Sequence, residues 1–133
     1  MPHEQEFHVI VHPSSHNNEF PDENARAQEV WRSWGWAGEA VRFATARHVL
    51  HGWDSLIDTS YLNALSSATQ VTIGGQVTDV CVRIHAEYIA LHPRAREFTI
   101  VLDRQALVGS DEGLNHIVAY LQEQGISVSV REC

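Results

Sequence analysis

A cysteine in the second half of the chain stands where a strand gives way to a helix. The apolar run at 71–73 precedes the segment Gly75-Gln76-Val77-Thr78-Asp79-Val80-Cys81-Val82. The first turn of a helix offers unpaired N–H groups and a partial positive charge, which stabilise a thiolate and can receive an oxyanion. The segment therefore predicts that Cys81 is a nucleophile. The alternative is a small apolar residue, since free cysteines are among the most buried residues.

The other residues of this turn fit the same chemistry. A glycine at Gly75 lets a substrate approach the backbone closely, because it carries no side chain. Thr78 or Asp79 can cap the helix and so fix the loop that presents Cys81.

The composition restricts the class of protein. The chain has 133 residues, enough for one domain, and a formal net charge of -8 with arginine as its only basic residue besides histidine. An acidic chain without a basic stripe argues against a nucleic-acid partner and against an anionic membrane surface. No apolar run reaches the roughly 20 residues of a membrane span, and the first residues lack the features of a signal peptide. We therefore expect a cytoplasmic protein, and its two cysteines do not make a disulfide framework.

Apolar periodicity predicts strands that alternate with helices. We expect strands at 7–12, 41–44, 70–73, 97–102 and 126–130, and a loop at 48–58. Helices are expected to begin at Pro21 with Asp22 as a cap, at Thr59 or Ser60, at Val80, and at Ser110 or Asp111. This order predicts one α/β domain with three layers, α/β/α, around a mostly parallel five-stranded sheet. Ligands bind at the carboxyl ends of such strands, where the turn before Cys81 lies.

The segment from Gly75 to Val82 resembles the G-x-x-T-[DN]-x-C-V signature of the isochorismatase-like cysteine hydrolases. This superfamily includes nicotinamidases, N-carbamoylsarcosine amidases and isochorismatases, and the resemblance extends over residues 58–130. It implies a Rossmann-like domain, here shortened in its N-terminal half. It also implies that Cys81 attacks a small amide or related C–N bond and forms an acyl-enzyme. Backbone N–H groups of Val77 and Cys81 would form the oxyanion hole, beside a cis peptide bond between Gln76 and Val77.

The two other catalytic residues of that family have no clear counterpart. The family uses an aspartate on its first strand and a lysine on a later strand, and this chain has no lysine. If the strand at 7–12 is the first strand, the acid position falls on Val11 or His12. A second alignment matches 12–16 to a metal-binding stretch on the second strand of nicotinamidases. It places the metal-binding aspartate of that stretch at Ile10 and leaves the entire first strand absent. We favour the first alignment, because losing a central strand would leave a hole in the core.

Other side chains can take over the acid–base role or contact a substrate. The candidates are His12, His16, Arg47, His48, His51 and Trp53. Histidines can transfer a proton near neutral pH, the arginine can only stabilise a thiolate, and the tryptophan, with Trp36, can line an aromatic slot. The alternatives are exposed loop histidines and tryptophans in a core or interface. His12 and His16 lack a nearby carboxylate and are more typical of a polar loop than of a metal site, so we expect no metal ion and no cofactor.

The sequence supports three functional hypotheses. The first is a cysteine hydrolase with a small amide-like substrate, which predicts a depressed pKa for Cys81. The second is a catalytically degenerate relative that serves as a binding or assembly protein, favoured by the missing lysine and acid. The third is a ligand-binding protein that uses the same pocket. The four tryptophans and the shortened sheet further predict a homo-oligomer.

Overall fold

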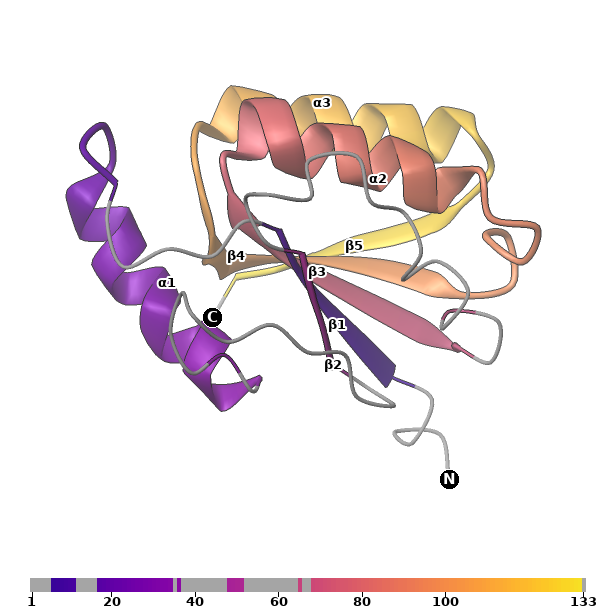
Figure 1. Ribbon diagram of the computed structural model, residues 1–133. Helices are drawn as coiled ribbons and strands as arrows, with labels where there is room; N and C mark the ends of the chain where they lie inside the picture. Colours follow the sequence, from indigo (N-terminus) through magenta and orange to yellow (C-terminus); the bar gives the residue numbers. More distant parts are fainter. Residues whose placement is uncertain are drawn as a thin grey trace.

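The fold is built on a parallel sheet. A computed structural model describes residues 6–11, 17–34, 36, 48–51, 65 and 68–132, with the backbone alone for residues 6, 48–51 and 79. Its strands are β1 (Glu6–Val11), β2 (His48–His51), β3 (Gln70–Gln76), β4 (Thr99–Val108) and β5 (Ser127–Arg131). Within the described residues these strands form one five-stranded sheet in the order β2-β1-β3-β4-β5, and every neighbouring pair is parallel (Figure 1).

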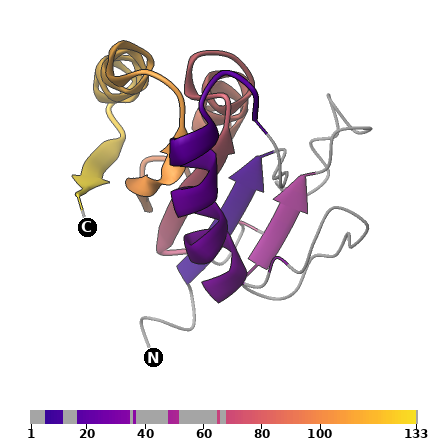
Figure 2. The same ribbon diagram turned by 90° about the vertical axis from the view of Figure 1, so that its left-hand side faces the viewer.

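Helices cover both faces of this sheet. They are α1 (Pro21–Ser33), the π-helical turn η3 (Thr78–Val82), α2 (Arg83–Ala90) and α3 (Asp111–Glu123). Figures 1 and 2 show α2 and α3 side by side over one face and α1 against the other face, where it packs on β4 and β3. The α/β class predicted from the sequence is confirmed. No helix in the described part of the chain is long and apolar enough to cross a membrane.

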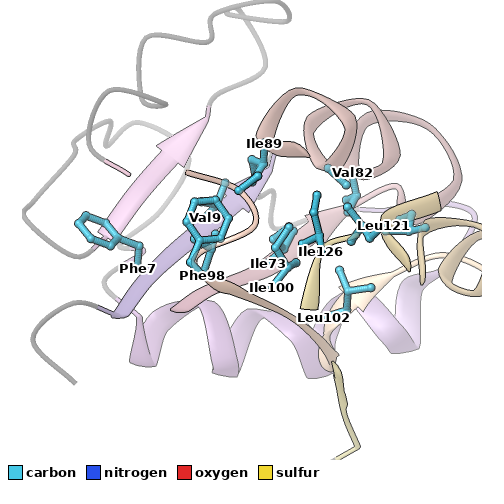
Figure 3. Close-up of a cluster of buried hydrophobic side chains, with 14 of the residues drawn as sticks. Phe7, Val9, Ile73, Val82, Ile89, Phe98, Ile100, Leu102, Leu121 and Ile126 are labelled. Atoms are coloured by element: carbon cyan, nitrogen blue, oxygen red, sulfur yellow. The ribbon is translucent and has the colours of Figure 1, made fainter. Parts of the chain in front are cut away.

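Alternating side chains of the strands pack into two separate hydrophobic cores, one on each face of the sheet. On β1, Phe7, Val9 and Val11 belong to the core under α2 and α3, whereas Ile10 belongs to the core under α1. Figure 3 shows the first core, in which Ile73 and other side chains of the sheet lie beneath the helices. This period of two, with both faces apolar, is what a parallel sheet covered on both sides requires.

Tryptophans dominate the core under α1. Trp31 is fully buried, donates from Nε1 to the carbonyl oxygen of Ala106 at 2.8 Å, and packs edge-on against Trp36 with ring centroids 5.6 Å apart. Trp36 is itself only 4% exposed. It therefore belongs to the core, which was the alternative interpretation, and does not line a substrate slot. A Cβ at Gly74 would lie 2.9 Å from the Trp34 ring, so the glycine makes room for that ring.

Strand β2 differs from the sequence expectation of a loop at 48–58. Residues 48–51 pair in parallel with β1, so that His48 lies opposite His8 and His51 lies opposite Val11. Pairing with a neighbouring strand supplies backbone partners to a segment with little strand preference of its own. The strand expected at 41–44 and the helix expected from Thr59 or Ser60 fall outside the described residues.

Strand β3 also differs, because it continues through both glycines to Gln76 instead of ending there. Gly75 has φ 123° and lies opposite Val11, whose carbonyl oxygen would be 2.2 Å from a Cβ at this position. Glycine thus permits β3 to pair with β1 at a position where the strand was expected to end. Strand β4 runs to Val108, past the predicted end at 102, with a register shift against β3 at residues 103–106.

The helix starts follow the expected chemistry in one case and depart from it in another. Ser110 caps α3, its Oγ accepting from the Gly113 N–H at 3.0 Å, as predicted. Asp22 does not cap α1. Pro21 opens that helix, and the side-chain oxygen of Asn17 accepts instead from the Phe20 N–H at 2.7 Å. Helix α1 therefore starts without a side-chain cap, and Asn17 holds the turn that precedes it. The proline at the first helical position fixes φ and has no N–H that would need a cap.

Candidate functional site

Cys81 lies at the carboxyl end of β3, the middle strand of the sheet. β3 ends at Gln76, η3 begins at Thr78, and Cys81 is in this first turn. The carbonyl oxygen of Val77 accepts from the N–H groups of Val80 and Val82 at 3.0 and 3.2 Å, which anchors the turn to the strand. The peptide bond between Gln76 and Val77 is cis. The strand, turn and helix therefore occur in the order that the sequence predicted.

The turn is not held by a side-chain cap. Val77 occupies the N-cap position of η3, so the capping role predicted for Thr78 is wrong. The helix begins at Thr78 itself, one residue earlier than that role requires. Thr78 is buried and packs instead against Gly109, where a Cβ would come 2.7 Å from the threonine hydroxyl oxygen. The side chain of Asp79 lies outside the described part of the structure.

Cys81 is a free cysteine, and its side chain is partly buried. It packs against the core under α2 and α3. Burial raises its pKa, and a backbone hydrogen bond with Val77 lowers the pKa by less, so the net direction is upward from the ordinary value of 9.0. The predicted depression of this pKa is therefore wrong. Loss of water around the thiolate outweighs a single backbone hydrogen bond, and no charged side chain of the described residues contributes.

Apolar residues occupy the positions where the resemblance places an acid. Val11 is fully buried opposite Gly75, and Ile10 is fully buried in the core under α1. Under the first alignment Val11 therefore supplies no acid beside Cys81, and under the second Ile10 supplies no metal-binding carboxylate. The remaining candidate for that position, His12, lies outside the described residues.

The other candidate contacts of Cys81 are only partly placed. His16, Arg47 and Trp53 lie outside the described residues. The backbone of β2 brings His51 to the carboxyl edge of the sheet, in the same row as Val11 and Gly75. Two strand spacings, about 10 Å, separate that position from β3. His48 lies three residues earlier on the same strand, away from this edge.

A network of carboxamide side chains, which the sequence analysis missed, surrounds the last residue of β3. Gln76 and Asn24 are almost completely buried, and Asn17 joins them. One signal was available in the sequence. Asn24 shares a helical stripe with the buried Ala27 and Trp31, and a polar residue on a buried stripe indicates a hydrogen-bonded partner.

A polar cleft of about 230 Å³ lies beside the turn, between α1, β4 and the start of α3. It is lined by Glu23, Arg26, Thr78, Arg104, Leu107, Gly109, Ser110, Asp111 and Leu114. Its charged side chains already have hydrogen-bond or ion-pair partners. Arg26 donates to three carbonyl oxygens of β4, the Glu23 carboxylate accepts from the Gly109 N–H, and Arg104 pairs with Asp111 and Glu132. Cys81 does not line this cleft.

Metal-binding side chains do not gather in the part of the chain that the structure describes. No group of three or more histidine, cysteine, aspartate or glutamate side chains there can hold a metal ion.

Comparison with known proteins adds no relative to this picture. No model of a known protein family matches the chain, and no curated protein and no solved structure matches it significantly.

Proposed function

We propose that the chain is a small cysteine hydrolase with an isochorismatase-like fold, which cleaves a C–N bond of a small amide through Cys81. One observation carries the proposal. The Cys81 thiol lies in the first turn after the middle strand of a parallel sheet, and the backbone of Val77 hydrogen-bonds to it. The likeness of 75–82 to the family signature supports the same conclusion.

The reaction follows from the groups at this turn. The Cys81 thiolate attacks the carbonyl carbon, and the resulting oxyanion is received by the N–H groups of Val77 and Cys81. The C–N bond breaks, and the nitrogen takes a proton from a water molecule and leaves as ammonia. Water then hydrolyses the thioester, which releases the acid and restores the thiol. In the resting protein the Val77 backbone bonds to the sulfur, so its N–H has to exchange this partner for the oxyanion.

The raised pKa of Cys81 sets the pH at which this reaction runs. A thiol whose pKa lies above 9.0 is less than about 1% ionised at pH 7. The thiolate is the nucleophile, so turnover is expected to increase about tenfold for each pH unit between pH 7 and pH 9.

Ammonia release tests the proposal. Wild-type protein and Cys81→Ala would be incubated from pH 7 to pH 9.5 with nicotinamide, carbamoyl amino acids and simple primary amides. We expect ammonia from the wild type alone, increasing with pH. Turnover that persists in Cys81→Ala would refute the role of the thiol. No turnover with any of these amides would favour the second candidate below.

The second candidate is a catalytically degenerate relative that binds a small amide-like ligand or assembles with other chains. It is favoured by the raised thiol pKa, by the buried Val11 at the acid position and by the absence of lysine. Thermal-shift measurements with the same amides would separate binding from chemistry. A rise in melting temperature without ammonia release supports this candidate.

Self-association is part of both proposals. Val80, Ile84 and Leu91 of the η3–α2 segment are exposed, at 55%, 42% and 75% of their surface. Exposed apolar side chains of this size favour contact with another molecule. Size-exclusion chromatography with light scattering at micromolar concentration is expected to give a homo-oligomer, and a clean monomer would contradict this. We also propose that the protein is cytoplasmic and binds neither nucleic acid nor membranes.

A further inference from the structure

The side chain of Gln76 is held by two other carboxamides. Its Oε1 accepts from Nδ2 of Asn17 and from Nδ2 of Asn24, each at 3.0 Å. Gln76 is 1% exposed and Asn24 is 2% exposed, so the bond between them is buried, whereas the bond to Asn17 is partly buried. The network joins the residue at the end of β3 to the segment that opens α1.

One end of the network fixes the orientation of Asn17. The backbone N–H groups of Glu19 and Phe20 both donate to Oδ1 of Asn17, at 3.0 and 2.7 Å. An N–H can only donate, so this atom has to be the oxygen. The amide nitrogen of Asn17 therefore points at Gln76, which has to present its oxygen.

The other end of the network fixes the orientation of Asn24. Nη2 of Arg32 donates to Oε1 of Gln28 at 2.9 Å, and a guanidinium has no acceptor. Gln28 therefore turns its nitrogen to Oδ1 of Asn24, at 2.7 Å. Asn24 is left with its nitrogen toward Gln76. Two independent chains of hydrogen bonds thus converge on the same oxygen and allow one orientation of the Gln76 side chain.

Gln76 lies directly before Val77, the residue that anchors the turn carrying Cys81. Gln76 is bonded directly to Val77, whose carbonyl oxygen holds the first turn of η3 through the N–H groups of Val80 and Val82. The backbone of Val77 also forms the hydrogen bond to Cys81. The Val77 N–H belongs to the peptide unit that joins Val77 to Gln76, so a rotation of this unit would change the direction of that N–H.

Stability alone does not account for carboxamides at these positions. Apolar side chains of the same shape would bury as much surface without desolvating polar groups, and such replacements are often neutral or stabilising. A network with one allowed orientation supplies fixed geometry instead.

We propose that Gln76, held by Asn17 and Asn24, is a positioning residue that sets the Val77 backbone against the sulfur of Cys81. The proposal stands on the hydrogen bonds that hold Gln76 and on those that anchor the turn to the Val77 carbonyl oxygen, and its meaning for catalysis rests on the proposed hydrolase function. The network therefore governs how readily the thiol ionises and how well the turn receives an oxyanion.

The rate of alkylation of Cys81 as a function of pH tests this. In a Cys133→Ser background, iodoacetamide labelling of Asn24→Ala is compared with that of the parent and of Ala27→Gly, which loosens the same helix outside the network. Loss of the Val77 hydrogen bond removes the influence that lowers the pKa, so we expect the midpoint of the Asn24→Ala profile to move upward. At pH 7.5 labelling is expected to slow about threefold. Ala27→Gly is expected to keep the parent's midpoint.

Two further variants keep the test decisive if Asn24→Ala does not fold. Gln76→Met keeps the shape of the side chain and cannot accept the two hydrogen bonds. Asn17→Ala changes a side chain on the partly exposed end of the network. Both are expected to move the midpoint upward. An unchanged midpoint in folded variants, or an equal change in Ala27→Gly, overturns the proposal. Because the readout is thiol ionisation, it does not depend on turnover, and a failure of the hydrolase function would appear separately as absent ammonia release.

Discussion

The ionisation of Cys81 separates a thiol that is ready to react from one that has to be deprotonated first. Burial raises the pKa of this thiol above 9.0. An activated cysteine of pKa about 6.5 would be about 75% ionised at pH 7, against less than about 1% here. The difference in thiolate population is therefore about 75-fold.

A single rate measured at pH 7 is nevertheless a poor test. Nucleophilicity falls with decreasing pKa, with a Brønsted coefficient of about 0.45, so the activated thiolate is itself less reactive than the thiolate of a thiol with a raised pKa. The two effects act in opposite directions, so the net difference in labelling rate is much smaller than the difference in thiolate population, and partial burial of the sulfur can imitate it. The position of the midpoint on the pH axis is free of this problem.

The assay is labelling of Cys133→Ser protein with iodoacetamide between pH 6 and pH 10, followed by intact-mass spectrometry. We expect the rate constant to rise about tenfold per pH unit and to show no plateau below pH 9. The same protein in denaturant serves as the control and is expected to reach its midpoint at a lower pH. A plateau below pH 8 in the folded protein would refute the reasoning, because it would show that the turn depresses the thiol pKa.

Three further changes test the structure around the site. Gly75→Ala places a Cβ 2.2 Å from a backbone oxygen, so we expect the free energy of unfolding, measured in urea, to fall by more than about 3 kcal/mol. Gly125→Ala is the control, because its Cβ would have its nearest neighbour at 3.4 Å, and it should cost about 1 kcal/mol. Trp31→Phe leaves the buried carbonyl of Ala106 without its donor at 2.8 Å and should cost about 1–3 kcal/mol by the same measurement, whereas a change below 0.5 kcal/mol would mean that water replaces the indole. The folded state holds the Cys81 proton to higher pH than the unfolded state, so the free energy of unfolding should decline as pH rises from the unfolded to the folded pKa. Cys81→Ala should reduce this decline between pH 8 and pH 10. An unchanged decline in the variant would contradict the raised pKa.

Local patterns made part of the fold predictable. Helix α3 was visible from its apolar stripe and its Ser110 cap, and the strand that became β5 from alternation. The position of Cys81 followed from the order of strand, glycines and helix. These features depend on residues close together in the sequence, so periodicity and capping chemistry were sufficient.

Other features depend on contacts between distant segments. Residues 48–51 became a strand because β1 offers a pairing edge, and β3 passes through Gly75 because Val11 approaches it closely. The hydrogen bond from Asn24 to Gln76 joins positions 52 residues apart. The upward direction of the Cys81 pKa is set by how deeply the core covers the sulfur. No local pattern in the sequence contains this information.

The acyl-enzyme is the species that the hydrolase proposal requires. Wild-type protein and Cys81→Ala would be mixed with the amide panel at pH 9, quenched in acid within seconds, and measured by intact-mass spectrometry with peptide mapping. The account predicts a mass increase equal to the acyl group on the peptide that contains Cys81, absent from Cys81→Ala. An unmodified wild type with every amide, or the same adduct in the alanine variant, would contradict it.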